Sequence, residues 1–294
     1  MKKLLALLFA LTMVLALAAC GGTAETEPAE EETETAEAAE TETAEAEETE
    51  STGDTVTLRV GASPTPHAEI LAQVKDDLAE QGIDLQIVEY TDYVVPNTAV
   101  EDGEDDANYF QHTPYMENFN AERGTHLVNV GDIHYEPMGI YAGQTTALED
   151  LPDGATIAVP NDATNEGRAL LLLQAQGLIT IDEAAGLECT PNDITENPKN
   201  LVFKELEAAM LPQTVEEVDL SVINSNYALQ AGFNPVEDSL AIETAEGTPY
   251  PNVIAVKEGN ENNEAIQALV KALQSDKVRD YIEQTYGGAV VALF

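Results

Sequence analysis

Short apolar segments alternate with amphipathic segments from residue 55 to the C-terminus. The short segments are rich in branched and apolar side chains, which is typical of buried strands, whereas the amphipathic segments repeat their apolar positions at helical spacing. In the first part of this region the predicted strands are 57–62, 85–90, 107–110 and 127–130, and the predicted helices are 68–80 and 114–121. This order of strands and helices predicts one α/β lobe.

A second series of strands and helices begins after Tyr141. Its strands are predicted at 155–159, 201–205 and 220–223, and its helices at 166–176 and 227–230. A last strand at 251–256 precedes helices at 263–274 and 277–284, which have no later strand to cover and are expected to pack on the first lobe. The chain would cross between the lobes twice, which predicts a hinged, two-lobed α/β fold with a central cleft. The first lobe would comprise 55–140 and 253–294, and the second lobe 141–252.

The first twenty residues have the layout of a signal peptide. Lys2 and Lys3 precede an apolar run, residues 4–17, which is shorter than the roughly 20 residues that a membrane-spanning helix needs. Residues 17–20, Leu-Ala-Ala-Cys, resemble the lipobox of bacterial lipoproteins, in which the cysteine is lipidated before cleavage. We therefore expect residues 1–19 to be removed and lipid on Cys20 to hold the protein at the extracytoplasmic face of the cell membrane. The alternative is ordinary signal cleavage beside an unmodified cysteine.

Residues 20–54 are strongly acidic. Residues 25–50 contain 13 glutamates, no basic residue and no aromatic residue, and the whole chain has a formal net charge of -43. A segment with so little apolar surface is expected to be a disordered tether, because like charges four residues apart, such as Glu27 and Glu31, oppose the competing helix. The acidic chain also argues against nucleic acid or anionic lipid as a partner, since both would be repelled.

Sequence signatures of catalysis are absent, and we predict no enzymatic activity and no cofactor. The chain has no G-x-S-x-G, G-x-G-x-x-G, Walker or H-E-x-x-H motif. Its four histidines have no metal-ligand spacing, so we predict no metal site unless the fold assembles one. Cys189 is a lone thiol, and a hydrolase that used it as nucleophile would need a nearby histidine that the sequence does not indicate.

The most informative segment is 160–168, where a strand leads into a helix. Thr164 or Asn165 is the expected helix cap, and Arg168 follows in the first turn. Unpaired backbone N–H groups and a two-pronged arginine at a helix N-terminus suit a carboxylate ligand. The alternative, equally weighted on these residues alone, is an ordinary capped helix whose arginine pairs with Asp162 or a neighbour.

A second candidate cluster is aromatic. Alternation along 107–112 places Phe110 and His112 on one face of a strand and Tyr109 on the other, and Tyr90 and Tyr93 precede this strand. Aromatic rings beside polar donors suit a pocket for an apolar or sulfur-bearing side chain, although the end of a core strand gives the same pattern.

A third cluster, 224–227, contains Asn224 and Asn226 where a strand opens into a helix, the place where ligands bind in open α/β sheets. An ordinary asparagine cap is the alternative. The charge run 101–106 lacks calcium-loop spacing and is expected to be a solvated turn.

Several segments, in this order, resemble one family. They are 66–69 (Pro-His-Ala-Glu), 107–112, 136–141 (Glu-Pro-Met-Gly-Ile-Tyr), 160–168, 196–198 (Glu-Asn-Pro), 222–232 and 286–290 (Tyr-Gly-Gly-Ala-Val). The resemblance, which extends over residues 57–294, is to the NlpA lipoproteins, the methionine-binding receptors of bacterial ABC importers. It implies a type II-like periplasmic-binding-protein fold that captures L-methionine, with the D enantiomer left open, and delivers it to a membrane permease driven by an ATPase.

The resemblance also implies roles for particular residues. Arg168 would pair with the ligand carboxylate, Asn224 would bond its polar end, and three residues would surround the thioether, namely Tyr93, Phe110 and His112. Weaker candidates for the pocket or its support are Asn165, Asn226, Tyr90, Tyr109, His67 and Glu136. Other possibilities remain open at this stage: a receptor for another small apolar amino acid or a methionine-containing peptide, or a surface lipoprotein or adhesin without a transport role.

Overall fold

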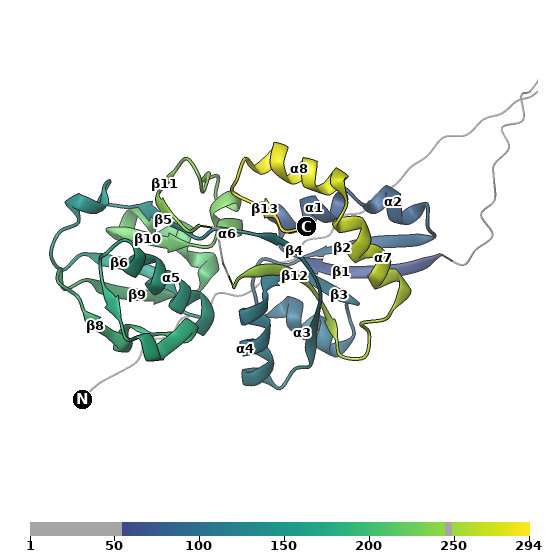
Figure 1. Ribbon diagram of the computed structural model, residues 1–294, viewed down its shortest axis with the longest axis horizontal. Coiled ribbons are helices and arrows are strands. Elements are labelled where there is room, and N and C mark those ends of the chain that lie inside the picture. The colour runs from purple at the N-terminus through teal and green to yellow at the C-terminus, as the bar shows by residue number, and fades with distance from the viewer. Residues whose placement is uncertain (1–54, 245–248) are drawn as a thin grey trace, which may run out of the picture. The chain divides into compact units, whose positions relative to one another are not determined.

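The computed structural model describes residues 55–244 and 249–294 (Figure 1). The predicted signal peptide, Cys20 and the acidic tether lie outside the described residues. Within the described ranges, no helix combines the length and the apolar character needed to cross a membrane.

The first lobe is built on a six-stranded sheet. Its strand order is β13-β4-β12-β3-β1-β2, with β1 parallel to β2 and β3, and β12 antiparallel to β3 and β4. The strands are β1 (Val56–Ala62), β2 (Ile83–Glu89), β3 (Ala107–His112), β4 (Leu127–Tyr135), β12 (Pro251–Lys257) and β13 (Val291–Ala292).

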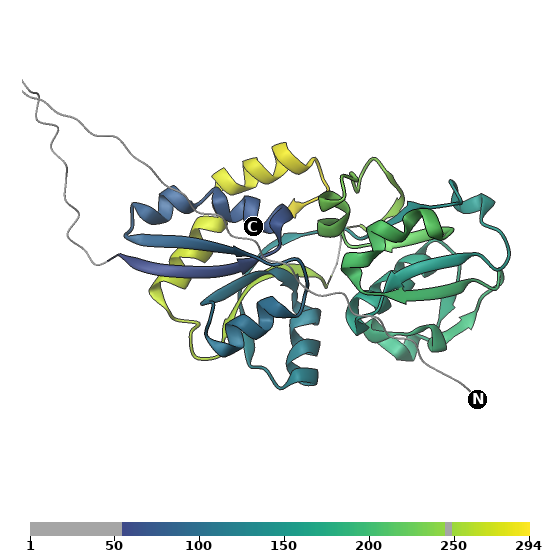
Figure 2. The same ribbon diagram turned by 180° about the vertical axis from the view of Figure 1, so that it is seen from behind.

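Helices cover both faces of this sheet (Figure 1, Figure 2). Successive strand residues point to opposite faces, so Ile254 and Val256 of β12 join one core cluster while Val253 and Ala255 join another. The first core includes residues of α1 (Glu69–Ala72), α2 (Lys75–Ala79), α7 (Glu264–Leu273) and α8 (Asp276–Tyr286), and the second includes residues of α3 (Val95–Asp102) and α4 (Thr113–Arg123). As predicted, the two C-terminal helices pack on the first lobe.

The second lobe has a five-stranded sheet with the order β11-β5-β10-β6-β9. Its strands are β5 (Gly139–Ala142), β6 (Thr156–Pro160), β9 (Val202–Leu206), β10 (Leu220–Ile223) and β11 (Ser239–Ile242). Helix α5 (Ala163–Ala175) packs on one face, and η5 (Ala208–Glu217) with α6 (Ser225–Gln230) packs on the other. A two-stranded sheet of β7 (Thr180–Ile181) and β8 (Ile194–Glu196) and the short helices η2 (Leu148–Asp150), η3 (Glu183–Glu188) and η4 (Pro191–Asp193) complete this lobe.

The chain passes between the two sheets twice. β4 ends at Tyr135 in the first sheet and β5 begins at Gly139 in the second, and the chain returns between Ile242 of β11 and Pro251 of β12. The predicted two-lobed α/β fold is therefore confirmed. The lobe boundaries placed at residues 140/141 and 252/253 stay predictions, and β5 and β12 cross these positions.

Several local predictions were wrong. Residues 68–80 do not form one helix, because Val74 leaves the helical region (φ -106, ψ 2) between α1 and α2. The run 101–106 is not only a solvated turn: it begins with the end of α3, and Asp105 is buried, accepting a hydrogen bond from the Tyr90 hydroxyl at 2.8 Å. The many charged residues in this run obscured the apolar periodicity of α3, so the helix was not predicted.

Candidate ligand-binding site

A narrow pocket lies between the lobes, where several strands end. The residues that line it are Tyr93, Phe110, Gln111, His112, Tyr115 and Asn252 from the first lobe, Asn165, Arg168, Asn224, Ser225 and Asn226 from the second, and Glu136 from the first crossing. β3, β6 and β10 all reach the cavity with their carboxyl ends, which is the usual place for a ligand in an α/β sheet.

Helix α5 brings two polar residues to the cavity. Asp162, and not the predicted Thr164 or Asn165, caps this helix, because its Oδ1 accepts a hydrogen bond from Asn165 N at 3.1 Å. The helix therefore begins at Ala163, three residues before the predicted start. Asn165 and Arg168 lie three residues apart, so they share one face of the helix at its N-terminal end.

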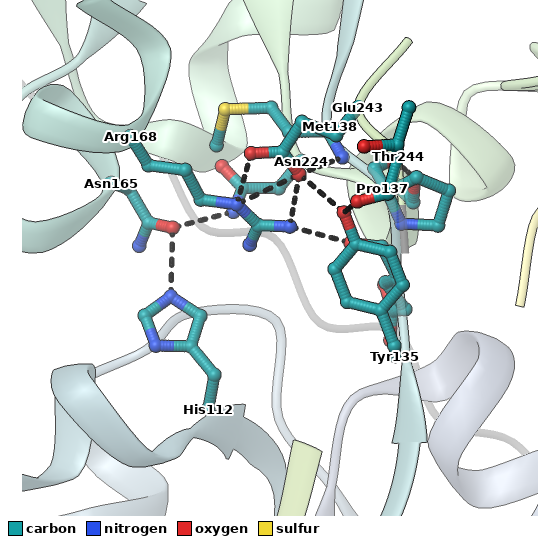
Figure 3. A network of polar contacts seen from close by, with 11 residues as sticks. His112, Tyr135, Pro137, Met138, Asn165, Arg168, Asn224, Glu243 and Thr244 are labelled. Atoms are coloured by element: carbon teal, nitrogen blue, oxygen red, sulfur yellow. Dashed lines mark hydrogen bonds and ion pairs between the residues drawn. The ribbon is translucent and has the colours of Figure 1, made fainter. Parts of the chain in front are cut away.

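Arg168 is almost fully buried, and its main partner is Glu243 (Figure 3). Its Nε donates to both Glu243 carboxylate oxygens at 2.9 and 3.1 Å, and its Nη2 donates to Glu243 Oε2 and to the backbone oxygen of Glu136, both at 2.6 Å. Of the alternative in which Arg168 pairs with Asp162 or a neighbour, Asp162 is thus the wrong partner, and the carboxylate that pairs with Arg168 is that of Glu243. Burial opposes the charge, but the Glu243 carboxylate raises the pKa of Arg168 above its usual value, so the guanidinium stays charged. Across residues 55–244 and 249–294, Nη1 has no hydrogen-bond partner.

Asn165 joins the two lobes. Its Oδ1 accepts hydrogen bonds from His112 Nε2 at 3.1 Å and from Asn224 Nδ2 at 2.8 Å, and its own Nδ2 donates to Asp162 Oδ1 at 2.8 Å. The proton of His112 is on Nε2, because Nδ1 accepts a hydrogen bond from Tyr115 N. Burial, with the nearby charge of Arg168, lowers the pKa of His112 to about 3, so this histidine is neutral.

Two buried amide atoms beside the cavity lack partners among the described residues. They are Asn224 Oδ1, an acceptor, and Asn226 Nδ2, a donor. Each unsatisfied buried group costs about 1–3 kcal/mol, so a ligand that offers both a donor and an acceptor would be stabilised here. Together with the free Nη1 of Arg168, these atoms suit a zwitterion.

The opposite wall is aromatic. Tyr93, Phe110 and Tyr115 pack with ring centroids between 5.7 and 6.1 Å apart, and Tyr93 also lies 4.9 Å from the ring of Tyr227. The Tyr93 hydroxyl donates to Asn226 Oδ1 at 2.6 Å, which makes a second link between the lobes. A wall of ring faces and edges suits an apolar or thioether side chain.

Behind the cavity, two histidines converge on Glu136. Its Oε1 lies 2.8 Å from His134 Nε2 and 3.2 Å from His67 Nε2, and Tyr109 contacts His134 Nδ1 through its hydroxyl. Burial lowers the pKa of His67 to about 4 and that of His134 to about 3, and it raises the pKa of Glu136. The two histidines and Glu136 place three potential metal donor atoms within 4.8 Å of one another, a grouping that sequence spacing did not predict. His67 Nε2, His134 Nε2 and Glu136 Oε1 already contact hydrogen-bonding neighbours, whereas His67 Nδ1 has no partner among the described residues. The group forms a polar network around Glu136.

Eight of the eleven predicted site residues line the cavity, and they are Tyr93, Phe110, His112, Glu136, Asn165, Arg168, Asn224 and Asn226. His67 and Tyr109 belong to the network behind Glu136, whereas Tyr90 does not line the cavity and bonds Asp105. Sequence reasoning missed Gln111, Tyr115, Ser225 and Asn252. Gln111 and Ser225 adjoin predicted residues, and Tyr115 follows His112 by three residues. Asn252 is the one polar residue in the predicted strand 251–256, which is a usable signal.

Comparisons with known proteins give consistent matches. The sequence profile of the NlpA lipoproteins matches residues 58–294. The methionine-binding lipoprotein MetQ of Bacillus subtilis is 44% identical over 236 residues, which cover 79% of this chain and 86% of that protein.

Solved structures agree with the fold. A nutrient binding protein from Burkholderia cenocepacia bound to methionine is 42% identical, with a TM-score of 0.78 over 81% of this chain and 100% of that one. An ABC transporter periplasmic substrate-binding protein from Coxiella burnetii is 40% identical, with a TM-score of 0.77 over 80% of this chain and 100% of that one.

Proposed function

Because the chain belongs to the NlpA lipoprotein family, we propose that it captures methionine between its two lobes and delivers it to an ABC permease. The observation that carries this proposal is the set of open polar atoms in the cavity. Arg168 Nη1, Asn226 Nδ2 and Asn224 Oδ1 offer donors to a carboxylate and an acceptor to an ammonium group. The names of the relatives support methionine as the zwitterion.

Each predicted site residue except Tyr90 has a place in this proposal. Arg168 pairs with the ligand carboxylate, Asn224 accepts from its ammonium group, and the thioether packs on Tyr93, Phe110 and His112. Most of the remaining predicted residues hold these groups: Asn165 and Asn226 join the lobes, and Glu136 with His67 and Tyr109 forms the buried polar wall. Tyr90, which bonds Asp105, has no role in this proposal. Ligand contacts to both lobes favour the closed form, so binding drives closure without any chemical reaction.

Calorimetric titration tests the proposal. Protein stripped of bound ligand by unfolding and refolding would be titrated with both methionine enantiomers, norleucine, leucine, glutamate and a methionine-containing dipeptide. We expect one-to-one binding of L-methionine and no heat with glutamate, whose second carboxylate has no partner in the aromatic wall. Tryptophan is absent from the chain, which makes calorimetry a better probe than fluorescence. If neither methionine enantiomer gave a heat of binding, methionine would be excluded as the ligand.

The proposed location is the extracytoplasmic face of the cell membrane, with lipid on Cys20. There the acidic tether would keep the binding lobes close to a permease and its ATPase. Cys20→Ala should move the protein from the membrane fraction to the soluble fraction while the calorimetric affinity for L-methionine stays the same. A Cys20→Ala protein that still sediments with membranes would contradict the lipid anchor.

A further inference from the structure

Glu243 is the most heavily bonded carboxylate at the edge of the candidate site. Its two oxygens accept from Arg168 through Nε and Nη2, from the Tyr135 hydroxyl at 2.9 Å and from Met138 N at 2.8 Å. Figure 3 shows these donors converging on the one carboxylate. The side chain of Glu243 is 14% exposed and that of Arg168 is 3% exposed, so water screens the pair only weakly.

The donors come from different parts of the fold. Arg168 lies on α5, Tyr135 ends β4 in the first sheet, and Met138 lies in the first crossing. Glu243 itself follows β11, where the chain leaves the second sheet, and its backbone N donates to Met138 O at 3.0 Å. The carboxylate therefore ties the ligand-facing arginine to both segments that connect the lobes.

This arrangement controls how the arginine is presented. Ordering an arginine side chain costs conformational entropy, and the binding of a ligand that met a free side chain would be weakened by that cost. Here Nε and Nη2 are bound by Glu243 and by Glu136 O, and the Tyr250 ring lies 4.3 Å from the guanidinium carbon. The guanidinium plane is thus fixed before a ligand arrives, with Nη1 left over.

We propose that Glu243 is a positioning residue for ligand binding, which holds Arg168 against the two crossings so that Nη1 meets the ligand carboxylate. The inference rests on the proposed function, in which Arg168 receives that carboxylate. It assigns to Glu243 no contact with the ligand. Its effect must therefore depend on whether the ligand has a carboxylate.

The test compares two ligands on matched variants. Glu243→Gln keeps the size of the side chain and removes its charge, Glu243→Asp keeps the charge but shortens its reach, and Glu101→Gln is the control. Glu101 also accepts from a backbone N–H, that of His126, and pairs with a cation, Lys257, but it lies away from the cavity. Each variant is titrated with L-methionine and with L-methioninamide, which lacks the carboxylate.

We expect both Glu243 variants to bind L-methionine at least about tenfold more weakly and to change the affinity for L-methioninamide less than about threefold. Glu101→Gln should change neither affinity. An equal loss for both ligands would show a merely structural role and would overturn the proposal, as would unchanged methionine binding.

A measurement without ligand separates this inference from the proposed function. In the wild type, the Nε–H proton of Arg168, assigned by its loss in Arg168→Lys, should exchange slowly with solvent because it is buried on Glu243. In Glu243→Gln and Glu243→Asp it should exchange at least about tenfold faster. If wild-type protein showed this protection but did not bind methionine, the proposed function would be refuted, whereas the ordering of Arg168 by Glu243 would be supported. If the proton exchanged equally fast in all variants, the positioning role would be refuted.

Discussion

His112 Nε2 and Asn165 Oδ1 lie 3.1 Å apart, and this contact joins the end of β3 in the first lobe to the first turn of α5 in the second lobe. The same oxygen accepts from Asn224 Nδ2, so a single amide couples both lobes to the residue proposed to bind the ligand ammonium group. One of the contacts across the cleft therefore runs through a buried asparagine, and Asp162 orients its amide by accepting a hydrogen bond from Asn165 Nδ2.

Asn165→Ala should weaken L-methionine binding by about tenfold to a hundredfold, because it leaves two buried donors without an acceptor. Asn118→Ala is the matched control, since Asn118 also links the lobes, donating to Glu188 at 3.3 Å, but at an exposed position. Its effect should be less than about threefold. Calorimetry measures both, and equal effects would mean that interlobe contacts in general, and not the buried amide, set the affinity.

Arg168→Lys should lower the affinity for L-methionine by at least about thirtyfold although the positive charge is kept. A lysine has one ammonium group and cannot bond Glu243, Glu136 O and a ligand from fixed directions as a guanidinium does. Arg59→Lys is the control, because Arg59 pairs with buried Asp105 on the first lobe. Retention of full affinity in Arg168→Lys would contradict the carboxylate role.

The fold was largely predictable, because the apolar periodicity that defines it is local. The second lobe, for example, could be assigned from short strands such as β6 and β10, whose buried residues are consecutive along the sequence. Elements with weak periodicity were missed: α3 presents few apolar side chains among its polar ones, and β5 has only four residues.

The candidate site was predictable only where its residues sit in a recognisable local setting. Arg168 was found because a strand runs into a helix beside it. Its partner Glu243 lies 75 residues away after an edge strand, and no sequence signal links the two. Likewise, His67 and His134 are brought together by the sheet, since η1 (Pro64–Ala68) follows β1 while His134 lies on β4.

The buried histidines should make the ligand-free protein less stable as the pH falls from 7 to 5. The pKa of His112 is about 3 in the folded protein, because of burial and the charge of Arg168, against an ordinary value of 6.5. As the pH falls, His112 is therefore protonated in the unfolded chain before it is protonated in the folded protein. Its contribution to the free energy of unfolding is fully present above about pH 6.5 and declines below that pH. This histidine should contribute a loss of about 2 kcal/mol by pH 5.

His112→Asn checks this contribution, because asparagine keeps a capping side chain for α4 but does not titrate. In urea denaturation, the free energy of unfolding should fall by about 2 kcal/mol less in the variant than in the wild type when the pH is lowered from 7 to 5. Identical losses would show that His112 is already free to protonate in the folded state.

Glu166 should have the opposite pH dependence. Burial, followed by the nearby charges of Glu205 and Asp162, raises the pKa of Glu166 to about 7, and its Oε1 has no partner within the described chain. The folded protein keeps the proton that the unfolded chain loses near pH 4.5, so the free energy of unfolding decreases as the pH rises from about 4.5 to about 7 and then levels off. The free energy of unfolding of Glu166→Gln, relative to that of the wild type, should rise by on the order of 2 kcal/mol between pH 5 and pH 8. A gain that is the same at both pH values would contradict the raised pKa.

Gly167, in the first half of α5, should not tolerate a side chain. A Cβ at this position would lie 2.1 Å from Leu187 O and 3.0 Å from Cys189 N, so the backbone at the end of η3 would have to move away from the helix. Gly167→Ala should therefore destabilise the protein by about 2 kcal/mol or more in urea denaturation. It should also weaken L-methionine binding, because Arg168 is the next residue and Asn165 lies in the same turn.

Gly177, just beyond the end of α5, separates this steric effect from the general effect of adding a methyl group. Its φ is +72°, and no atom of the described residues lies within 4 Å of a Cβ placed there, so Gly177→Ala should destabilise the protein only through the backbone strain, by about 1 kcal/mol. Its affinity for L-methionine should be unchanged because the cavity is at the other end of the helix. If the two variants lost the same stability and affinity, close packing of α5 against residues 187–189 would not be what holds Asn165 and Arg168 in place.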